Sequence, residues 1–382
     1  MKKAMIKRIV CCAFCLSALF LLNGCWDYRG LNEITLVSGV AVDKDPLTGR
    51  YLVSCEIIDL TQSLQEKGPT GKVIESEGST IFEAVRNAKR RLVNKLYFGN
   101  AQVLVLSEQV VKEENLSDVI DWFLRDAECR ETVPVVISQE KKASDLFRVS
   151  GTDQTVAAFE LNSIVTKDPE FTSTTSPLEL YKVFDKIVNP GISPTLPAFH
   201  ITENDEKEID ELNGIAIFKN ERLQGYLSPE DSKYFLFITN GVKGGILPIF
   251  SNDDGSNDVS LEIFENKTKP SFSYKDGKLK IKLKVQTTVD VAEAEIKMAS
   301  SDDQTIKKLE KTGSEQLKRR MEAVIKKVQK QYNSDIFGFG KLIYKKNPKL
   351  WETLSPDWDT LFPNLEVEIT PEIRIINTAL KK

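Results

Sequence analysis

The first half of the chain alternates apolar and polar residues with periods that predict strands and helices in turn. Two β-rich runs over residues 34–42 and 50–58, joined by a polar loop with a proline and a glycine, predict a hairpin. Further along, apolar spacings predict helices and strands in alternation: helices at 80–96 and 117–126, strands at 101–106 and 133–138. Because the two types alternate, we expect a sheet with crossover helices in this region.

From residue 167 onward the sequence pattern changes. Residues 167–200 carry five prolines around a short helical pattern, which is typical of a linker. Residues 212–228 have the pattern of a strand, a turn and a strand. Strand alternation then fills residues 261–291, an amphipathic pattern predicts a long helix at 302–332, and one more strand follows it.

Together these patterns predict an α+β protein of three domains, each a mainly antiparallel or mixed β-sheet flanked by α-helices. A chain of 382 residues is long enough for two or three hydrophobic cores. We expect an N-terminal α/β-type domain over 25–200 that ends in the proline-rich linker. A middle domain covers 201–258, with residues near 58–75 as a candidate addition. In the C-terminal domain, 259–382, the helix at 302–332 packs on a sheet.

The amino terminus has the pattern of a secretory signal. Residues 2–8 hold four cations, and residues 9–22 form an apolar run without charge. This run is shorter than the ~20 residues that a membrane-spanning helix requires, so we expect residues 1–24 to be removed as a signal peptide. No later segment of the sequence has the length and apolarity of a spanning helix.

The residues that end the apolar run indicate a lipid anchor. Leu22-Asn23-Gly24-Cys25 resembles the lipobox of bacterial lipoproteins, in which cleavage makes the cysteine the new amino terminus. The resemblance implies cleavage between Gly24 and Cys25, a diacylglycerol on the Cys25 thiol and an N-acyl chain such as palmitate. Two or more acyl chains hold a protein on a membrane stably, whereas one holds it only marginally. The alternative is an ordinary signal peptide followed by a coincidental cysteine.

Charge and cysteine content narrow the range of possible functions. The formal charge of −4 becomes −8 once the four cations of residues 1–24 are removed, and an acidic body argues against nucleic-acid binding. Four of the six cysteines lie within residues 1–25, which leaves Cys55 and Cys129 in the body. A disulfide between these two is one option, but their apolar and helical settings favour free buried thiols.

No catalytic, metal or cofactor site is predicted. His200 is the only histidine and lies in the proline-rich stretch without a nearby cysteine, so nucleophilic and metal chemistry lack their usual residues. Carboxylates such as those at 203–206 are typical of a solvated loop unless two of them converge in a cleft. We therefore expect a protein that is not an enzyme.

Two helical segments concentrate positive charge. Arg86, Lys89, Arg90 and Arg91 lie on the outer face of the helix expected at 80–96. The helix at 302–332 has nine Lys or Arg against three Glu between residues 305 and 330. Exposure to solvent alone is enough to explain the positive charge on either helix face. The sharper alternative for the first is a membrane surface or phosphate, and for the second anionic lipid headgroups or an acidic protein surface.

Motifs spread along the chain resemble one known family. They are Cys25-Trp26-Asp27-x-Arg29, GVAVDKD at 39–45, G-x-A-x-F at 214–218, G-Y-L-S at 225–228, and D-x-F-G-F-G at 335–340 followed by P-x-x-W, a Trp and Phe-Pro before the last strand. In this combination they are similar to the Ger(x)C lipoproteins, the C subunits of nutrient germinant receptors in endospore-forming bacteria. The resemblance implies three domains, each a β-sheet flanked by helices.

The resemblance also implies a function. The expected protein is a lipid-anchored, non-enzymatic receptor subunit on the outer face of the spore inner membrane, needed to initiate germination. Its implied partners are two integral membrane subunits, an A-type and a transporter-like B-type. One alternative is a solute-binding lipoprotein that delivers a nutrient to a transporter, which would need a polar cleft between two similar lobes. Another is a cell-wall hydrolase, which would need a convergent pair of acids.

Overall fold

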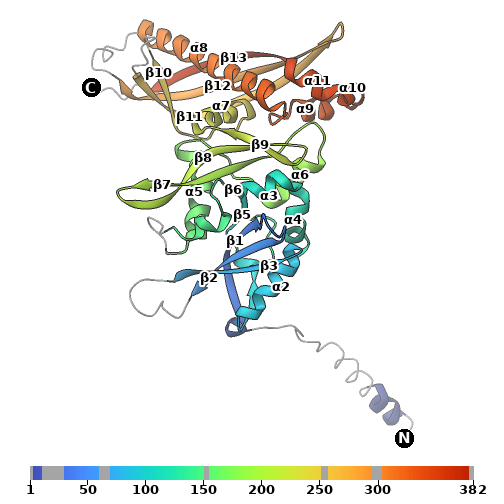
Figure 1. Cartoon of the computed structure of the whole chain (residues 1–382). Helices are drawn as coiled ribbons and strands as arrows, with labels where there is room; N and C mark the ends of the chain where they lie inside the picture. Colours follow the sequence, from blue (N-terminus) through green and yellow to red (C-terminus); the bar gives the residue numbers. More distant parts are fainter. Residues whose placement is uncertain are drawn as a thin grey trace.

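Two β-sheets with helices on their faces make up the protein in the computed structural model, which describes residues 3–10, 30–59, 69–149, 155–250, 257–294 and 303–377. Residues 3–10 are helical. The body begins at the lower end of Figure 1 with β1, and the second sheet with its long helix α8 lies at the upper end. The mixed architecture with flanking helices that the sequence predicts is confirmed.

The larger sheet has nine strands within the described residues, in the order β3-β2-β1-β5-β6-β7-β8-β9, with β4 paired to β1. They are β1 (Ile34–Lys44), β2 (Tyr51–Asp59), β3 (Thr70–Gly78), β4 (Lys95–Tyr97), β5 (Val103–Ser107), β6 (Val135–Ser138), β7 (Thr195–Asn204), β8 (Lys207–Lys219) and β9 (Arg222–Leu227). β1 and β2 form the predicted antiparallel hairpin. β1, β5, β6 and β7 run parallel, as crossover helices require, and β7, β8 and β9 are antiparallel.

Helices cover both faces of the larger sheet because its central strands are apolar on both sides. In β1, Val40 and Val42 face one core and Ala41 faces the other, as the two-residue period of a strand requires. The first core packs under α2 (Ile81–Ala88), α3 (Glu108–Glu113), α4 (Leu116–Arg125) and α6 (Leu180–Val188). The second packs under α5 (Ala157–Phe171) and a 3₁₀ turn at Ala143–Phe147.

Helix α2 is shorter than the sequence predicts. It starts where expected, because Thr80 Oγ1 accepts the Glu83 N–H at 3.1 Å. The helix expected over 80–96 nevertheless ends at Ala88, and after a short 3₁₀ turn the chain forms β4. β4 pairs in parallel with the start of β1, so Leu96, whose spacing fits a helix, is buried on a strand instead.

The proline-rich stretch is not the linker that its composition predicts, because it carries part of the core. α5 continues to Phe171 with Pro169 inside it, α6 places Leu180 and Val183 in the first core, and Phe199 of β7 is fully buried. Most of the prolines fall between these elements or near their ends, where the missing N–H costs little.

Strand pairing crosses the expected domain boundary at residue 200. β7 pairs with both β6 and β8, so residues on either side of that position share one sheet. β3, which covers part of the segment near 58–75, lies at the opposite end of this sheet from β9. The boundaries of the three expected domains stay a prediction.

The smaller sheet has the order β10-β11-β12-β13, and α8 packs along it. Its strands are β10 (Ile246–Phe250), β11 (Asn257–Lys275), β12 (Lys278–Ala294) and β13 (Glu366–Asn377). The accompanying helices are α7 (Pro229–Thr239), α8 (Asp303–Lys327), α9 (Phe339–Lys346), α10 (Pro348–Leu354) and α11 (Trp358–Leu361). α8 buries Leu317, Met321 and Val324 and continues as a π-helical turn to Tyr332, so it matches the helix predicted at 302–332.

Side chains of α8 also bond to both edge strands of the smaller sheet. Edge N–H groups donate to its side chains: Ile373 to Ser314 Oγ (3.0 Å), Ile375 to Glu310 Oε1 (2.9 Å) and Phe250 to Gln316 Oε1 (3.2 Å). Each edge strand also contains a proline, Pro248 in β10 and Pro371 in β13, which has no N–H to offer. Both edges are therefore poor templates for an added strand.

The D-x-F-G-F-G segment connects the region of the smaller sheet to the larger one. The carboxylate of Asp335 accepts three backbone N–H groups, from Gly338 (2.9 Å), Phe339 (3.1 Å) and Gly340 (2.7 Å). Gly340 lies against Gly191, whose carbonyl accepts the Lys341 N–H at 2.7 Å. A Cβ on Gly191 would lie 2.4 Å from the carbonyl carbon of Gly340, so this contact requires glycine.

Candidate functional site

The predicted lipidation site, Cys25, lies outside the described residues, as does the cleavage partner Gly24. The body begins at Gly30, five positions after Cys25, and that length of chain spans at most ~18 Å. A lipid on Cys25 would therefore keep this end of the body beside the membrane. The surface of the body at this end is therefore the first place to look for a functional site.

The surface at this end is positively charged. The 3₁₀ turn η2 (Lys89–Arg91) leads toward β4, which places Lys95 opposite Ile34 and Tyr97 opposite Leu36, the first residues of β1. The cations singled out in the sequence, Arg86 and the three of η2, are all exposed. The fold thus places Lys95 next to the point where the chain enters the body, and the other four cations lie further back along α2 and η2.

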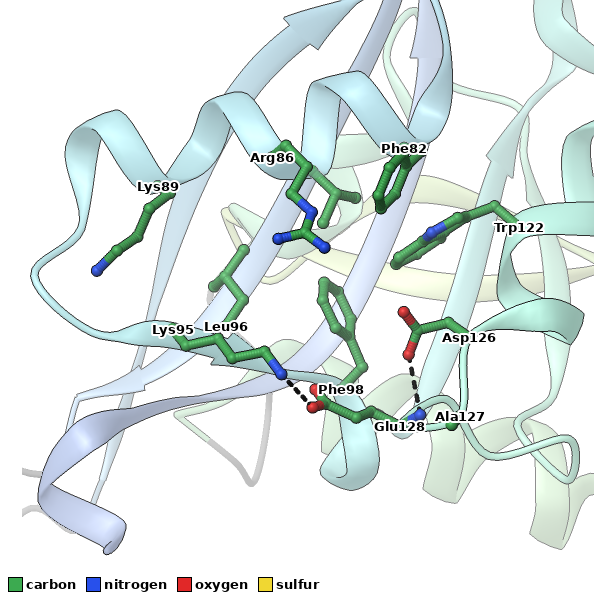
Figure 2. Close-up of a pocket in the computed structure, with 11 residues that line it drawn as sticks. Phe82, Arg86, Lys89, Lys95, Leu96, Phe98, Trp122, Asp126, Ala127 and Glu128 are labelled. Carbon is green, nitrogen blue, oxygen red and sulfur yellow. Dashed lines mark hydrogen bonds and ion pairs between the residues drawn. The ribbon is translucent and has the colours of Figure 1, made fainter. Parts of the chain in front are cut away.

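A groove of about 520 Å³ opens between α2 and α4 beside these cations (Figure 2). Three of its eleven lining residues are aromatic, and two of these, Phe98 and Trp122, pack edge to face at 5.3 Å between ring centres. The Arg86 guanidinium lies 4.9 Å from the centre of the Phe82 ring. A second cavity of about 590 Å³ is lined by Phe82 and Trp122 as well and reaches Tyr51.

The groove presents charges of both signs. Figure 2 shows Lys95 paired with Glu128, whose backbone N–H donates to the Asp126 carboxylate at 2.9 Å. Arg86 and Lys89 come from the α2 side. None of the eleven residues that line the groove is a histidine, cysteine or serine. It is suited to holding a charged molecule or protein segment with an apolar part.

Sequence reasoning missed this groove. Its walls come from segments near 82–98 and 122–128, which meet only because α2 and α4 lie on the same face of the larger sheet. The cationic side was visible as a charged helix face, but the acidic side and the aromatic floor carry no spacing that links them to it.

Buried carboxylates in the larger sheet have structural partners. Glu56 accepts the N–H groups of Ala157 at 2.8 Å and Ala158 at 3.0 Å, which caps the start of α5, and burial raises its pKa. Burial, with the nearby charge of Glu160, raises the pKa of Asp210 to about 8. Glu56 lies 101 residues from Ala157 and Asp210 lies 50 residues from Glu160, so no short motif indicates these contacts.

The other residues singled out in the sequence lie apart from the groove. His200 Nε2 lies 3.1 Å from the Glu211 carboxylate on neighbouring strands β7 and β8, and the acidic run 203–206 includes the exposed turn between these strands. Cys55 and Cys129 are free thiols, and burial raises the pKa of each to about 12.

The described residues contain no helix that is both long and apolar enough to cross a bilayer. Nor does any group of three His, Cys, Asp or Glu side chains in the same ranges gather as metal ligands do. Function must therefore be argued from surfaces and from relatives.

Comparison with known proteins identifies the family. Residues 27–201 match the model of the spore germination protein N-terminal domain, and residues 213–379 match the C-terminal model of spore germination B3/GerAC-like proteins. This chain belongs to the GerAC-like spore germination family. The two family matches are separated by residues 202–212, which include the turn between β7 and β8.

Other GerAC-like proteins are similar along nearly their whole length. Spore germination protein KC of Bacillus subtilis (strain 168) is 24% identical, over 99% of this chain and 97% of its own. Spore germination protein A3 of the same organism is 26% identical, over 94% of this chain and 95% of its own. The crystal structure of the GerBC protein has the same fold, with a TM-score of 0.58 and 21% identity over 89% of this chain and 97% of that one. The resemblance that the sequence motifs indicate is confirmed.

Proposed function

We propose that this family member is the lipid-anchored C subunit of a nutrient germinant receptor, held on the outer face of the spore inner membrane and needed to initiate germination. The main support is the family match, which starts at residue 27, two positions after the lipobox-like Cys25. Its partners are two integral membrane subunits, an A-type and a transporter-like B-type. No cofactor, metal or nucleic acid takes part.

A lipid tether makes weak contacts between subunits sufficient. Acyl chains on Cys25 confine the body to a thin layer beside the bilayer, which raises its concentration near integral partners into the ~mM range. An interface of modest intrinsic affinity then stays occupied. The subunit acts by docking, and the family match to spore germination proteins supports a non-enzymatic role.

Replacing Cys25 by Ala tests the anchor. We expect a folded protein that leaves the membrane fraction and spores that respond poorly to nutrients, because losing the tether lowers avidity by ~10²-fold or more. Cys129→Ala, which removes a thiol of the body instead, is the matched control and should keep both properties. Equal membrane retention and equal germination of the Cys25→Ala spores would defeat the proposal.

The groove favours a second candidate, a solute-binding lipoprotein that delivers a nutrient to a transporter. Its cations, carboxylates and aromatic rings suit a zwitterionic solute. Against this, the groove lies within one sheet-and-helix unit and not between two similar lobes. Calorimetry of the purified body with amino acids and sugars separates the candidates. A binding lipoprotein gives heats of binding with a micromolar dissociation constant, and Arg86→Ala removes this binding. A docking subunit gives no heat of binding.

A further inference from the structure

We propose that the loop after α2 rests on the anionic phospholipid headgroups of the membrane that holds Cys25. We call this area the 89–95 surface. It consists of Lys89, Arg90, Arg91, Val93 and Lys95, together with Arg86 from the preceding helix α2. The inference rests on the proposed lipid anchor and adds to it a second, electrostatic contact made by the folded body.

The charge of the 89–95 surface is largely unopposed. Its four arginine and lysine residues from positions 86 to 91 are exposed, and within the described chain none of them forms an ion pair with a carboxylate. Lys95 alone has one, with Glu128. The Lys89 ammonium donates to carbonyls of its own loop, and the Arg91 guanidinium donates to the Glu75 carbonyl. These neutral acceptors orient the side chains without cancelling their charge.

An exposed apolar side chain accompanies the cations. Val93 is 93% exposed, although it is flanked by the half-buried Leu92 and Asn94. In water an isolated exposed valine has no partner, but at a bilayer surface it can enter the boundary between headgroups and acyl chains. Cations around a protruding apolar residue are the composition of surfaces that bind membrane interfaces.

The position of the surface fits the tether. Because β4 pairs with the first residues of β1, the end of the loop that precedes β4 lies beside the start of the body, where at most ~18 Å of chain joins Gly30 to Cys25. The adjoining turn η1 (Leu31–Glu33) contributes one exposed carboxylate, Glu33. The net positive charge of this side of the body comes from the four cations at positions 86–91, which form no ion pair among the described residues.

The basic face of α8 is the natural comparison. Lys307, Lys308 and Lys311 are also exposed, and among the described residues no carboxylate pairs with them. Yet α8 lies at the upper end of the body in Figure 1, whereas β1 starts at the lower end. The two surfaces have similar charge and opposite placement, so the lipid contact is assigned to the 89–95 surface and not to α8.

Vesicle flotation of the unlipidated mature chain, residues 25–382 with Cys25→Ser, tests the surface separately from the anchor. The three hydrophobic clusters use residues between 37 and 373, so removing residues 1–24 leaves every described core intact. We expect binding to vesicles rich in phosphatidylglycerol, little binding to phosphatidylcholine alone, and loss of binding at high salt.

The variant Lys89→Gln/Arg90→Gln keeps the contact between Arg91 and Glu75. It should bind anionic vesicles roughly 10- to 25-fold more weakly, since each cation near an anionic surface contributes about five-fold. Lys307→Gln/Lys308→Gln removes the same charge from α8 and should bind like the parent. Thermal unfolding verifies that each variant is folded, and Arg90→Gln alone replaces the double variant if it is not.

Three results would overturn the assignment. They are equal binding by the parent and the 89–95 variant, an equal loss in the α8 variant, and no preference of the parent for anionic vesicles. None of these results bears on the anchor, which is judged from the membrane fractionation of Cys25→Ala.

Discussion

The contact between Gly191 and Gly340 allows a sharp test of the fold. Gly191 has φ +72°, and a Cβ there would lie 2.4 Å from the Gly340 carbonyl carbon and 2.6 Å from the Lys341 nitrogen. Gly277, in the turn between β11 and β12, has almost the same φ, +74°, but nothing within 4 Å of its Cβ position. The pair separates the cost of backbone conformation from the cost of a clash.

We expect Gly277→Ala to lower the free energy of unfolding by about 1 kcal/mol, the strain of a left-handed alanine. Gly191→Ala has the same strain plus a clash with backbone that cannot rotate away. The clash can be relieved by distorting bond angles, which costs ~4 kcal/mol for a 15° deviation. It can also be relieved by moving α9, which loses the packing of that helix and the Lys341 hydrogen bond to Gly191, the hydrogen bond alone at ~1 kcal/mol. The total for Gly191→Ala should be roughly 3–5 kcal/mol.

Urea unfolding of the mature chain with Cys25→Ser measures both variants. Trp351 and Trp358 pack in the core of the smaller sheet, so their fluorescence reports on the region that α9 joins. Gly340→Ala, whose Cβ would lie 2.7 Å from the Gly191 Cα, should behave like Gly191→Ala. If all three alanines cost the same within ~0.5 kcal/mol, the close approach of the two backbones is not a constraint and the reasoning is refuted.

Two further predictions concern pH and the sheet edges. Burial raises the pKa of Asp43 and Asp335 to about 6, so the folded state binds these protons more tightly than the unfolded state and the chain should be stabilised as the pH falls from 7 to 5, by about 1 kcal/mol per group. Urea midpoints at the two pH values check this, and a lower midpoint at pH 5 would contradict it. Gln316→Ala removes both hydrogen bonds to Phe250 on the β10 edge, so it should cost about 1–2 kcal/mol and promote aggregation on heating, measured by urea unfolding and light scattering. The exposed neighbour Glu315→Ala is the control, and equal behaviour of the two variants would show that the edge is not protected by this side chain.

Local periodicity predicted the elements whose contacts are short in sequence or whose amphipathic pattern is long. The β1–β2 hairpin and α8 are examples, because a turn and an apolar stripe specify them without help from distant residues. α5 was missed because its apolar pattern is irregular. It buries Glu160 and Asp168 as well as Leu161, contains Pro169, and leaves Phe171 exposed, so apolar residues do not mark one clear face.

β4 and the groove show where local reasoning stops. Leu92 and Leu96 have helical spacing, but parallel pairing with β1 decides that Leu96 belongs to a strand. The groove needs α2 and α4 side by side, and their contact depends on how the sheet orders its strands. The cations of the 89–95 surface were identifiable in sequence, whereas their place beside the start of β1 was not. Lipidation of Cys25 stays a prediction, since this residue lies outside the described residues.

The contacts between α8 and the edges of the smaller sheet matter for a protein with the proposed lipid anchor. Acylated proteins share a two-dimensional layer and collide with identical copies far more often than they would in bulk water. Unpaired backbone amides along a strand edge would allow such copies to pair with one another and form fibres. Side chains of α8 bond to amides on both edge strands, so crowded neighbouring copies cannot pair through those amides.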